Sequence, residues 1–99
     1  MNTPDVVGLI GAGTMGGRML ARLVESAHRV VVRDIDPRAA AHAAEAGADV
    51  VTSPAEVARR ADVVLLSLPM PSDVDTVVNG PDGLLTAAPA GAVIVDLST

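Results

Sequence analysis

A cluster of glycines near the N-terminus restricts the fold of this chain more than any other feature. Five glycines fall within positions 8–17, in the stretch VVGLIGAGTMGGRML. The stretch begins with the apolar run Val6–Ile10 and continues into a helical pattern over Thr14–Ala27. Glycine loses more conformational entropy on folding than any other residue. So many glycines at a strand–helix junction therefore indicate a backbone that must turn tightly or be approached closely.

Short apolar runs that are rich in β-branched residues recur along the chain and predict strands. The predicted strands are Val6–Ile10, Arg29–Arg33, Asp49–Val51, Asp62–Leu68 and Ala92–Leu97. Helical stretches separate them, and an alternation of this kind predicts parallel strands joined by right-handed crossovers. We therefore expect an α/β fold, a doubly wound parallel sheet of at least four strands.

Capping residues mark where the later helices begin. The predicted helices are Thr14–Ala27, a helix capped by Asp36 and stopped at Gly47, a helix capped by Ser53, and a helix capped by Ser72 that runs through Val78. Pro37 and Pro54 stand at first helical positions. Proline has no N–H, but an N–H at this position would have no partner within the helix. Glu56 lies three residues beyond Ser53 and is expected to complete a capping box with it.

Length and composition exclude several classes of function. Ninety-nine residues make one domain at most. There is no cysteine, and the two histidines, His28 and His42, stand apart, so we expect no metal site. A net charge of −5 argues against a nucleic-acid surface. No run approaches the roughly 20 apolar residues of a membrane span, and no signal-peptide pattern is present. We expect a cytoplasmic protein with no nucleic-acid or membrane partner.

Gly11, Gly13 and Gly16 form the pattern G-x-G-x-x-G between the first strand and the first helix. In a dinucleotide site the first glycine allows a tight turn, the second lets the backbone approach a pyrophosphate, and the third lets helix and strand pack closely. The helix N-terminus then offers unpaired N–H groups to the phosphates. Asp34 ends the second strand 21 positions beyond Gly13, where the ribose-binding acid is expected. The alternatives are a glycine-rich turn without a ligand and, for Asp34, a helix-entry residue.

Three motifs together resemble the β-hydroxyacid dehydrogenases, the group that contains 3-hydroxyisobutyrate dehydrogenase and tartronate semialdehyde reductase. The stretch from Gly8 to Met19 matches the opening of that family, G-x-I-G-x-G-x-M-G-x-x-M. Leu68–Pro69 matches a second element after the fourth strand, and Asp96–Thr99 matches the start of its D-x-S-T signature. The resemblance covers nearly the whole chain and implies a Rossmann-type NAD(P)-binding domain.

The resemblance also implies a set of cofactor contacts. Those in the glycine-rich loop would be Ile10, Gly11, Ala12, Gly13, Thr14, Met15 and Gly16. Asp34 would bind the adenosine ribose, and Leu68 and Pro69 would touch the cofactor through backbone and ring. Asp73 stands where relatives have a further cofactor contact, often asparagine.

The last two residues would reach the reacting end of the cofactor. Thr99 would lie at the nicotinamide, and Ser98 would help to bind the substrate carboxylate. Without the family pattern, Ser98 and Thr99 would be interpreted as a polar chain end, and Leu68–Pro69 as the stop of a strand.

Two departures from the family pattern affect what the chain is expected to do. Ala27 stands where relatives usually have glycine, so the first helix is expected to end differently. The family's catalytic lysine, a general acid, lies past Thr99, and this chain contains no lysine. We therefore interpret residues 1–99 as the N-terminal part of a dinucleotide-binding domain, truncated after about five strands, without the C-terminal helical domain and without a catalytic residue of its own.

The resemblance implies that the intact protein, a homo-oligomer, exchanges hydride between NAD(P) and a short β-hydroxyacid such as 3-hydroxyisobutyrate. Alternatives are an imine reductase, a 6-phosphogluconate dehydrogenase relative, or a non-catalytic dinucleotide-binding module. NAD is expected to be preferred and NADP to be possible, since relatives that use NADP carry Asn-Arg where this chain has Asp34 and Ile35. Strand alternation should point Arg33 to the opposite face of its strand, although its long guanidinium could fold back toward a phosphate.

Overall fold

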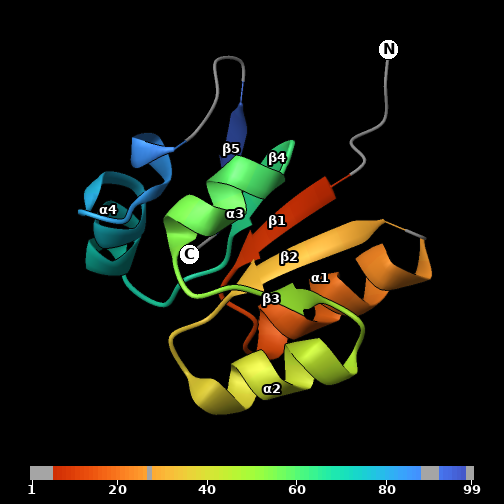
Figure 1. Cartoon of the computed structure of the whole chain (residues 1–99). Coiled ribbons are helices and arrows are strands. Elements are labelled where there is room, and N and C mark those ends of the chain that lie inside the picture. Colours follow the sequence, from red (N-terminus) through yellow and green to blue (C-terminus); the bar gives the residue numbers. More distant parts are fainter. Residues whose placement is uncertain (1–5, 27, 88–91, 98–99) are drawn as a thin grey trace.

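In the described part of the computed structural model, five strands form one parallel sheet (Figure 1). The structure describes residues 6–26, 28–87 and 92–97. The strands are β1 (Val6–Ile10), β2 (Arg29–Arg33), β3 (Asp49–Val50), β4 (Val63–Leu66) and β5 (Val93–Asp96). Their order in the sheet is β3-β2-β1-β4-β5, and every pairing is parallel. The predicted doubly wound parallel sheet is confirmed.

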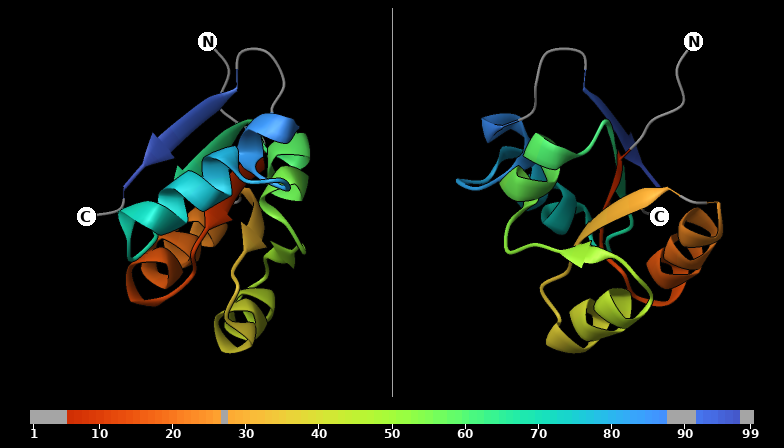
Figure 2. Two further views of the ribbon diagram at one scale, coloured as in Figure 1. Left: turned by 90° about the vertical axis from the view of Figure 1, so that its left-hand side faces the viewer. Right: turned by 45° about the vertical axis from the view of Figure 1, so that its right-hand side comes forward.

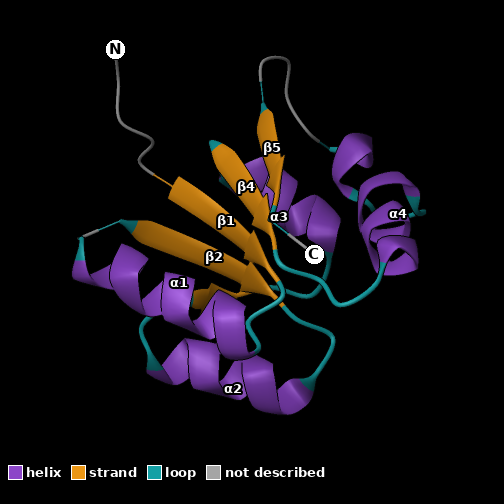
Figure 3. Cartoon of the chain, turned by 180° about the vertical axis from the view of Figure 1, so that it is seen from behind, coloured by secondary structure: helices purple, strands orange, loops and turns teal. Residues whose placement is uncertain are grey.

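Helices cover both faces of the sheet. They are α1 (Thr14–Glu25), α2 (Pro37–Glu45), α3 (Pro54–Arg60), α4 (Pro71–Asn79) and the short 3₁₀ helix η1 (Leu84–Thr86). Helices α1 and α2 lie together on one face (Figure 3), while α3 lies on the other (Figure 2). The order of the strands reverses between β1 and β4, and this is where ligands bind in sheets of this type.

The core consists of two apolar clusters, one on each face of the sheet. Leu9 and Val32 belong to the cluster under α1 and α2. Their chain neighbours Ile10 and Val31 belong to the cluster under α3 and η1, because successive side chains of a strand point to opposite faces. All four are buried. Burial on both faces explains why the central strands are continuous apolar runs.

Local capping chemistry explains where α2 and α3 begin. The carboxylate of Asp36 accepts a hydrogen bond from the N–H of Arg38 at 2.9 Å. The hydroxyl of Ser53 accepts one from the N–H of Glu56 at 3.2 Å. The Glu56 carboxylate pairs with Arg59. Gly47, with φ of +104°, follows α2 in the left-handed conformation that favours glycine.

The boundaries of β4 and α4 differ from the prediction. Strand β4 spans only Val63–Leu66 within the predicted 62–68, because the chain turns away before Pro69, which has no N–H to donate to the sheet. Helix α4 begins at Pro71, after Met70, rather than at Ser72. Proline already has the φ of a first helical residue, so the predicted cap lies inside the helix.

The remaining boundaries differ by one or two residues. Helix α1 ends at Glu25, and the predicted last residue, Ala27, lies outside the described residues. Strand β3 ends at Val50, one residue early. Strand β5 lacks the two predicted end residues, although the N–H of Leu97 still donates to the carbonyl of Leu66 at 2.9 Å.

Candidate functional site

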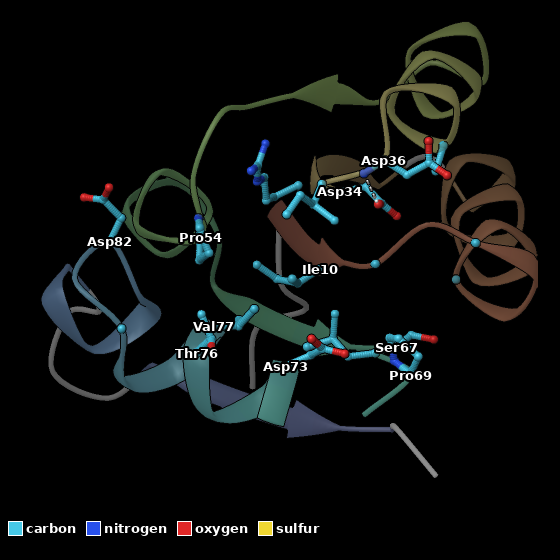
Figure 4. A pocket seen from close by; sticks show the side chains of 18 of the residues that line it. Ile10, Asp34, Asp36, Pro54, Ser67, Pro69, Asp73, Thr76, Val77 and Asp82 are labelled. Atoms are coloured by element: carbon cyan, nitrogen blue, oxygen red, sulfur yellow. Dashed lines mark hydrogen bonds between the residues drawn. The ribbon is translucent and has the colours of Figure 1, made fainter. Parts of the chain in front are cut away.

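A cavity of about 900 Å³ opens at the carboxyl ends of β1, β2 and β4, beside α4 (Figure 4). Its volume lies within the usual range for sites that bind small molecules. Eight of the residues predicted from the sequence line it, namely Ile10, Gly11, Gly13, Gly16, Asp34, Leu68, Pro69 and Asp73. The fold therefore gathers residues from four separate segments of the chain around one space.

The glycine turn, Gly11–Gly16, is shaped by two close backbone approaches. Gly11 has φ of +93°, a conformation that side chains other than glycine rarely adopt. A Cβ there would also overlap the carbonyl oxygen of Ser67, at the end of β4. A Cβ at Gly16 would overlap the carbonyl oxygen of Gly11. The turn is thus pressed between β4 and the first turn of α1, as the sequence pattern predicts.

Gly13 is different, because it faces open space. It is the N-cap residue of α1, and no side chain caps the helix there. A Cβ at Gly13 would meet nothing within 4 Å. The first turn of α1 contains no acidic residue, and Gly13 and Gly16 at this end of the helix line the cavity. The positive end of the helix dipole therefore lies beside the cavity without an acidic neighbour in that turn. This arrangement favours an anionic group.

Asp34 follows the last residue of β2, and both of its carboxylate oxygens accept backbone hydrogen bonds. Oδ2 accepts from the N–H of Ala12 at 2.6 Å. Oδ1 accepts from the N–H of Asp36 at 2.8 Å. The side chain is half-buried and lines the cavity. Its position is therefore fixed from two sides, close to the glycine turn.

The other predicted contacts are distributed differently. Ala12 is buried, and its N–H is donated to Asp34. Thr14 and Met15 begin α1, but their side chains fall outside the described part of the structure. Ser98 and Thr99 also lie outside the described residues. They follow β5, whose carboxyl end lies at the same edge of the sheet as the cavity.

Arg33 lines the cavity, which agrees with the alternative that its long side chain reaches back toward the site. Arg33 is the last residue of β2 and half-buried, and a long side chain at a strand end is not held to one face. Among the lining residues that the structure describes, it is the only cation. Four aspartates, Asp34, Asp36, Asp73 and Asp82, line the same cavity.

Sequence reasoning missed some of the apolar residues that line the cavity, among them Pro54 and Val77. Ile35, which is 87% exposed, also lines it, although the sequence had indicated this position only for the choice between NAD and NADP. Thr76 and Val77 follow Asp73 at spacings of three and four on α4, so the three share one helix face (Figure 4). That spacing could have extended the predicted site from Asp73 to the other two.

Two other kinds of feature are absent from the part of the chain that the structure describes. Across the described residues, no three or more His, Cys, Asp or Glu side chains gather in a way that could hold a metal ion. No helix in the described ranges combines the length and apolar character needed to cross a membrane.

Several known proteins are similar to this chain in sequence and in fold. Residues 6–99 match the family described as the NAD binding domain of 6-phosphogluconate dehydrogenase. The mitochondrial 3-hydroxyisobutyrate dehydrogenase of Mus musculus is 36% identical over 99 residues, which cover the whole chain and 30% of that protein.

Solved structures of related proteins are also similar to this chain. Mycobacterium tuberculosis 3-hydroxyisobutyrate dehydrogenase with L-serine has a TM-score of 0.86 and 35% identity, over 98% of this chain and 32% of that one. A structure of Psf3 in complex with NADP+ and 2-OPP has a TM-score of 0.86 and 32% identity, over 94% of this chain and 33% of that one. The chain thus spans about a third of the length of the relatives it matches.

Proposed function

Because the chain belongs to the family of the NAD-binding domain of 6-phosphogluconate dehydrogenase, we propose that its cavity binds a nicotinamide adenine dinucleotide. The observation that carries the proposal is the open side of Gly13, where a Cβ would meet nothing within 4 Å. A pyrophosphate at this position would meet the unpaired N–H groups of the first turn of α1. The fold provides the turn, the helix end and the space in one place.

The residues around the cavity could contact a dinucleotide at its ribose, at its middle part and at its nicotinamide. Asp34 follows β2, the strand beside β1. The remaining lone pairs of its carboxylate would accept hydrogen bonds from the adenosine ribose. Leu68 and Pro69 would contact the cofactor from the end of β4, and Asp73 from α4. Ser98 and Thr99, beyond β5, would serve the substrate carboxylate and the nicotinamide. When bound, the nicotinamide would accept or supply a hydride.

We infer a preference for NAD over NADP. The 2′-phosphate of NADP would lie beside the Asp34 carboxylate, and two unit charges 4 Å apart repel by about 4 kcal/mol at an effective dielectric constant of 20. Arg33 lines the same cavity and would offset part of that repulsion. Ile35 offers no charge to a phosphate. The balance favours the cofactor without the extra phosphate.

Calorimetric titration of NADH and NADPH into the chain tests both proposals. We expect NADH to bind at least about tenfold more tightly, which corresponds to 1.4 kcal/mol. Ile35→Arg adds a cation at the cavity and should narrow the gap. Leu85→Arg is the matched control, because Leu85 is also exposed, at 61%, and is not a lining residue. Equal or tighter binding of NADPH by the unmodified chain would contradict the inferred preference, and no binding of either would contradict the site.

For the intact protein, we propose reversible oxidation of a short β-hydroxyacid such as 3-hydroxyisobutyrate by a homo-oligomer. The proposal is supported by the dehydrogenase relatives, which are about three times as long as this chain. The general acid of such a reaction would be a lysine, and residues 1–99 contain none. We therefore propose that these residues bind the cofactor and do not by themselves turn over substrate.

A further inference from the structure

We propose that Asp34 is a positioning residue that holds the glycine turn in its binding conformation before any ligand arrives. This role is separate from the ribose contact, although its effect on phosphate binding rests on the proposed function. The side chain that would select the cofactor at one end would thus also set the phosphate site at the other.

The backbone ladder between β1 and β2 leads directly to this contact. Ile10 pairs with Arg33 at the end of the two strands. The N–H of Gly11 then donates to the carbonyl of Arg33 at 3.0 Å. The next N–H in the chain, that of Ala12, donates to the Asp34 carboxylate at 2.6 Å. The side chain of Asp34 therefore adds one more hydrogen bond to the ladder, across 22 residues of sequence.

The chemistry of the contact requires a carboxylate. Asp34 accepts from two N–H groups, one on each oxygen. An ionised carboxylate accepts at both oxygens, whereas an asparagine amide accepts at one atom and donates at the other. Asp34→Asn would therefore leave the N–H of Ala12 or of Asp36 facing an NH₂ group. Hydrogen bonds to charged acceptors are also the stronger kind.

The hydrogen bond from Ala12 to Asp34 acts as a brace at the one residue that lies between the two most permissive positions of the glycine turn. Gly11 and Gly13 flank Ala12, and glycine is the most permissive residue at the backbone. A turn that is already ordered loses less entropy when a ligand binds, so its affinity is higher. Asp34 would thus favour phosphate binding through order, although its own negative charge opposes an anion.

Hydrogen exchange in the ligand-free chain tests the brace directly. In Asp34→Asn, the N–H of Ala12 either faces the NH₂ group or bonds to a neutral amide oxygen, and in both cases it loses its charged acceptor. Its amide should therefore exchange faster, by about 10- to 100-fold where the hydrogen bond is lost. Asp36→Asn is the matched control, since it removes the same charge while asparagine still caps α2. Its Ala12 amide should exchange as in the unmodified chain. Equal exchange in the two variants would overturn the proposal.

A second measurement needs no variant and no ligand. In the unmodified chain, NMR should detect a scalar coupling through the hydrogen bond between the Ala12 nitrogen and the Asp34 Cγ. Its absence in the folded chain, together with fast exchange of the Ala12 amide, would overturn the proposal even if Asp34→Asn failed to fold.

Binding of inorganic pyrophosphate distinguishes two effects of Asp34, the ordering of the glycine turn and the repulsion of an anion by its negative charge. Loss of a negative charge alone should tighten binding of this anion, which is the result expected for Asp36→Asn. Loss of the brace should weaken binding in Asp34→Asn, so the two variants should change in opposite directions. Tightening in both would show that Asp34 acts by charge alone and overturn its positioning role. If the unmodified chain bound no pyrophosphate, the phosphate site itself would be wrong, and hydrogen exchange would still decide the brace.

Discussion

Neighbouring glycines in the first turns of α1 should respond in opposite ways to the same substitution. Gly16 lies against the turn, and a Cβ there would stand 2.9 Å from the carbonyl carbon of Gly11 and overlap its oxygen. Gly17 lies one position further along the same helix, and its Cβ would stand 3.5 Å from the carbonyl oxygen of Ala12, an ordinary contact. We predict that Gly16→Ala destabilises the chain and Gly17→Ala stabilises it.

The comparison isolates the packing cost. Replacing glycine by alanine inside a helix gains roughly 0.5–1 kcal/mol at either position, so this gain cancels in the difference. Overpacking costs about 1–3 kcal/mol. The upper part of that range applies at Gly16, because the obstacle is backbone and Gly11 is held by its bond to Arg33 at 3.0 Å. The two variants should therefore differ by about 2–3 kcal/mol in the free energy of unfolding.

Thermal and urea denaturation followed by far-UV circular dichroism would measure this difference, since the chain has no aromatic residue for fluorescence. For a domain of this size, 1 kcal/mol corresponds to about 4–8 °C in Tm. The unmodified chain should lie between the two variants, with Gly17→Ala melting at least about 8 °C above Gly16→Ala. Equal stabilisation by both substitutions would refute the reasoning that the turn is pressed against α1.

Three further outcomes are expected. Ser53→Ala removes the acceptor for the N–H of Glu56 and should lower the free energy of unfolding by about 0.5–2 kcal/mol in urea titrations; no change would show that the cap contributes nothing. Leu84→Ala removes a fully buried side chain and should cost about 2–5 kcal/mol, whereas Leu85→Ala, at an exposed neighbour, should change stability by less than about 0.5 kcal/mol. The chain should not oxidise NADH with methylmalonate semialdehyde in a spectrophotometric assay, because it has no lysine; sustained turnover would contradict this.

The secondary structure and its alternation could be predicted because their signals are local. Strands β1 and β2 were predicted residue for residue from apolar runs. The caps of α2 and α3 were predicted from Asp36-Pro37 and Ser53-Pro54. Parallel pairing then follows from general rules for crossovers, whereas the order of the strands in the sheet comes from the structure. The predicted start of α4 was wrong because Pro71 and Ser72 are both typical of helix starts, and the helix begins at the proline.

Contacts between distant segments could not be predicted in the same way. Nothing local indicates that the Asp34 carboxylate meets the N–H of Ala12, 22 positions away. Strand alternation could not decide where the Arg33 side chain lies, because alternation does not constrain the reach of a long side chain at a strand end. Nor does any local signal show why position 8 is glycine: a Cβ there would overlap Val57 of α3 and stand 2.9 Å from the Cβ of Ala61. These positions depend on how the layers pack.

The central claim is that the glycine turn and Asp34 hold a dinucleotide, and mapping of backbone amide shifts tests it most directly. Unlabelled NADH would be titrated into the ¹⁵N-labelled chain, and each amide would be followed to saturation. The claim predicts saturable shifts that are largest at Gly11, Gly13, Gly16 and Asp34, with one dissociation constant common to all four. Saturable shifts confined to other surfaces, or no saturable shift at these four amides, would contradict it.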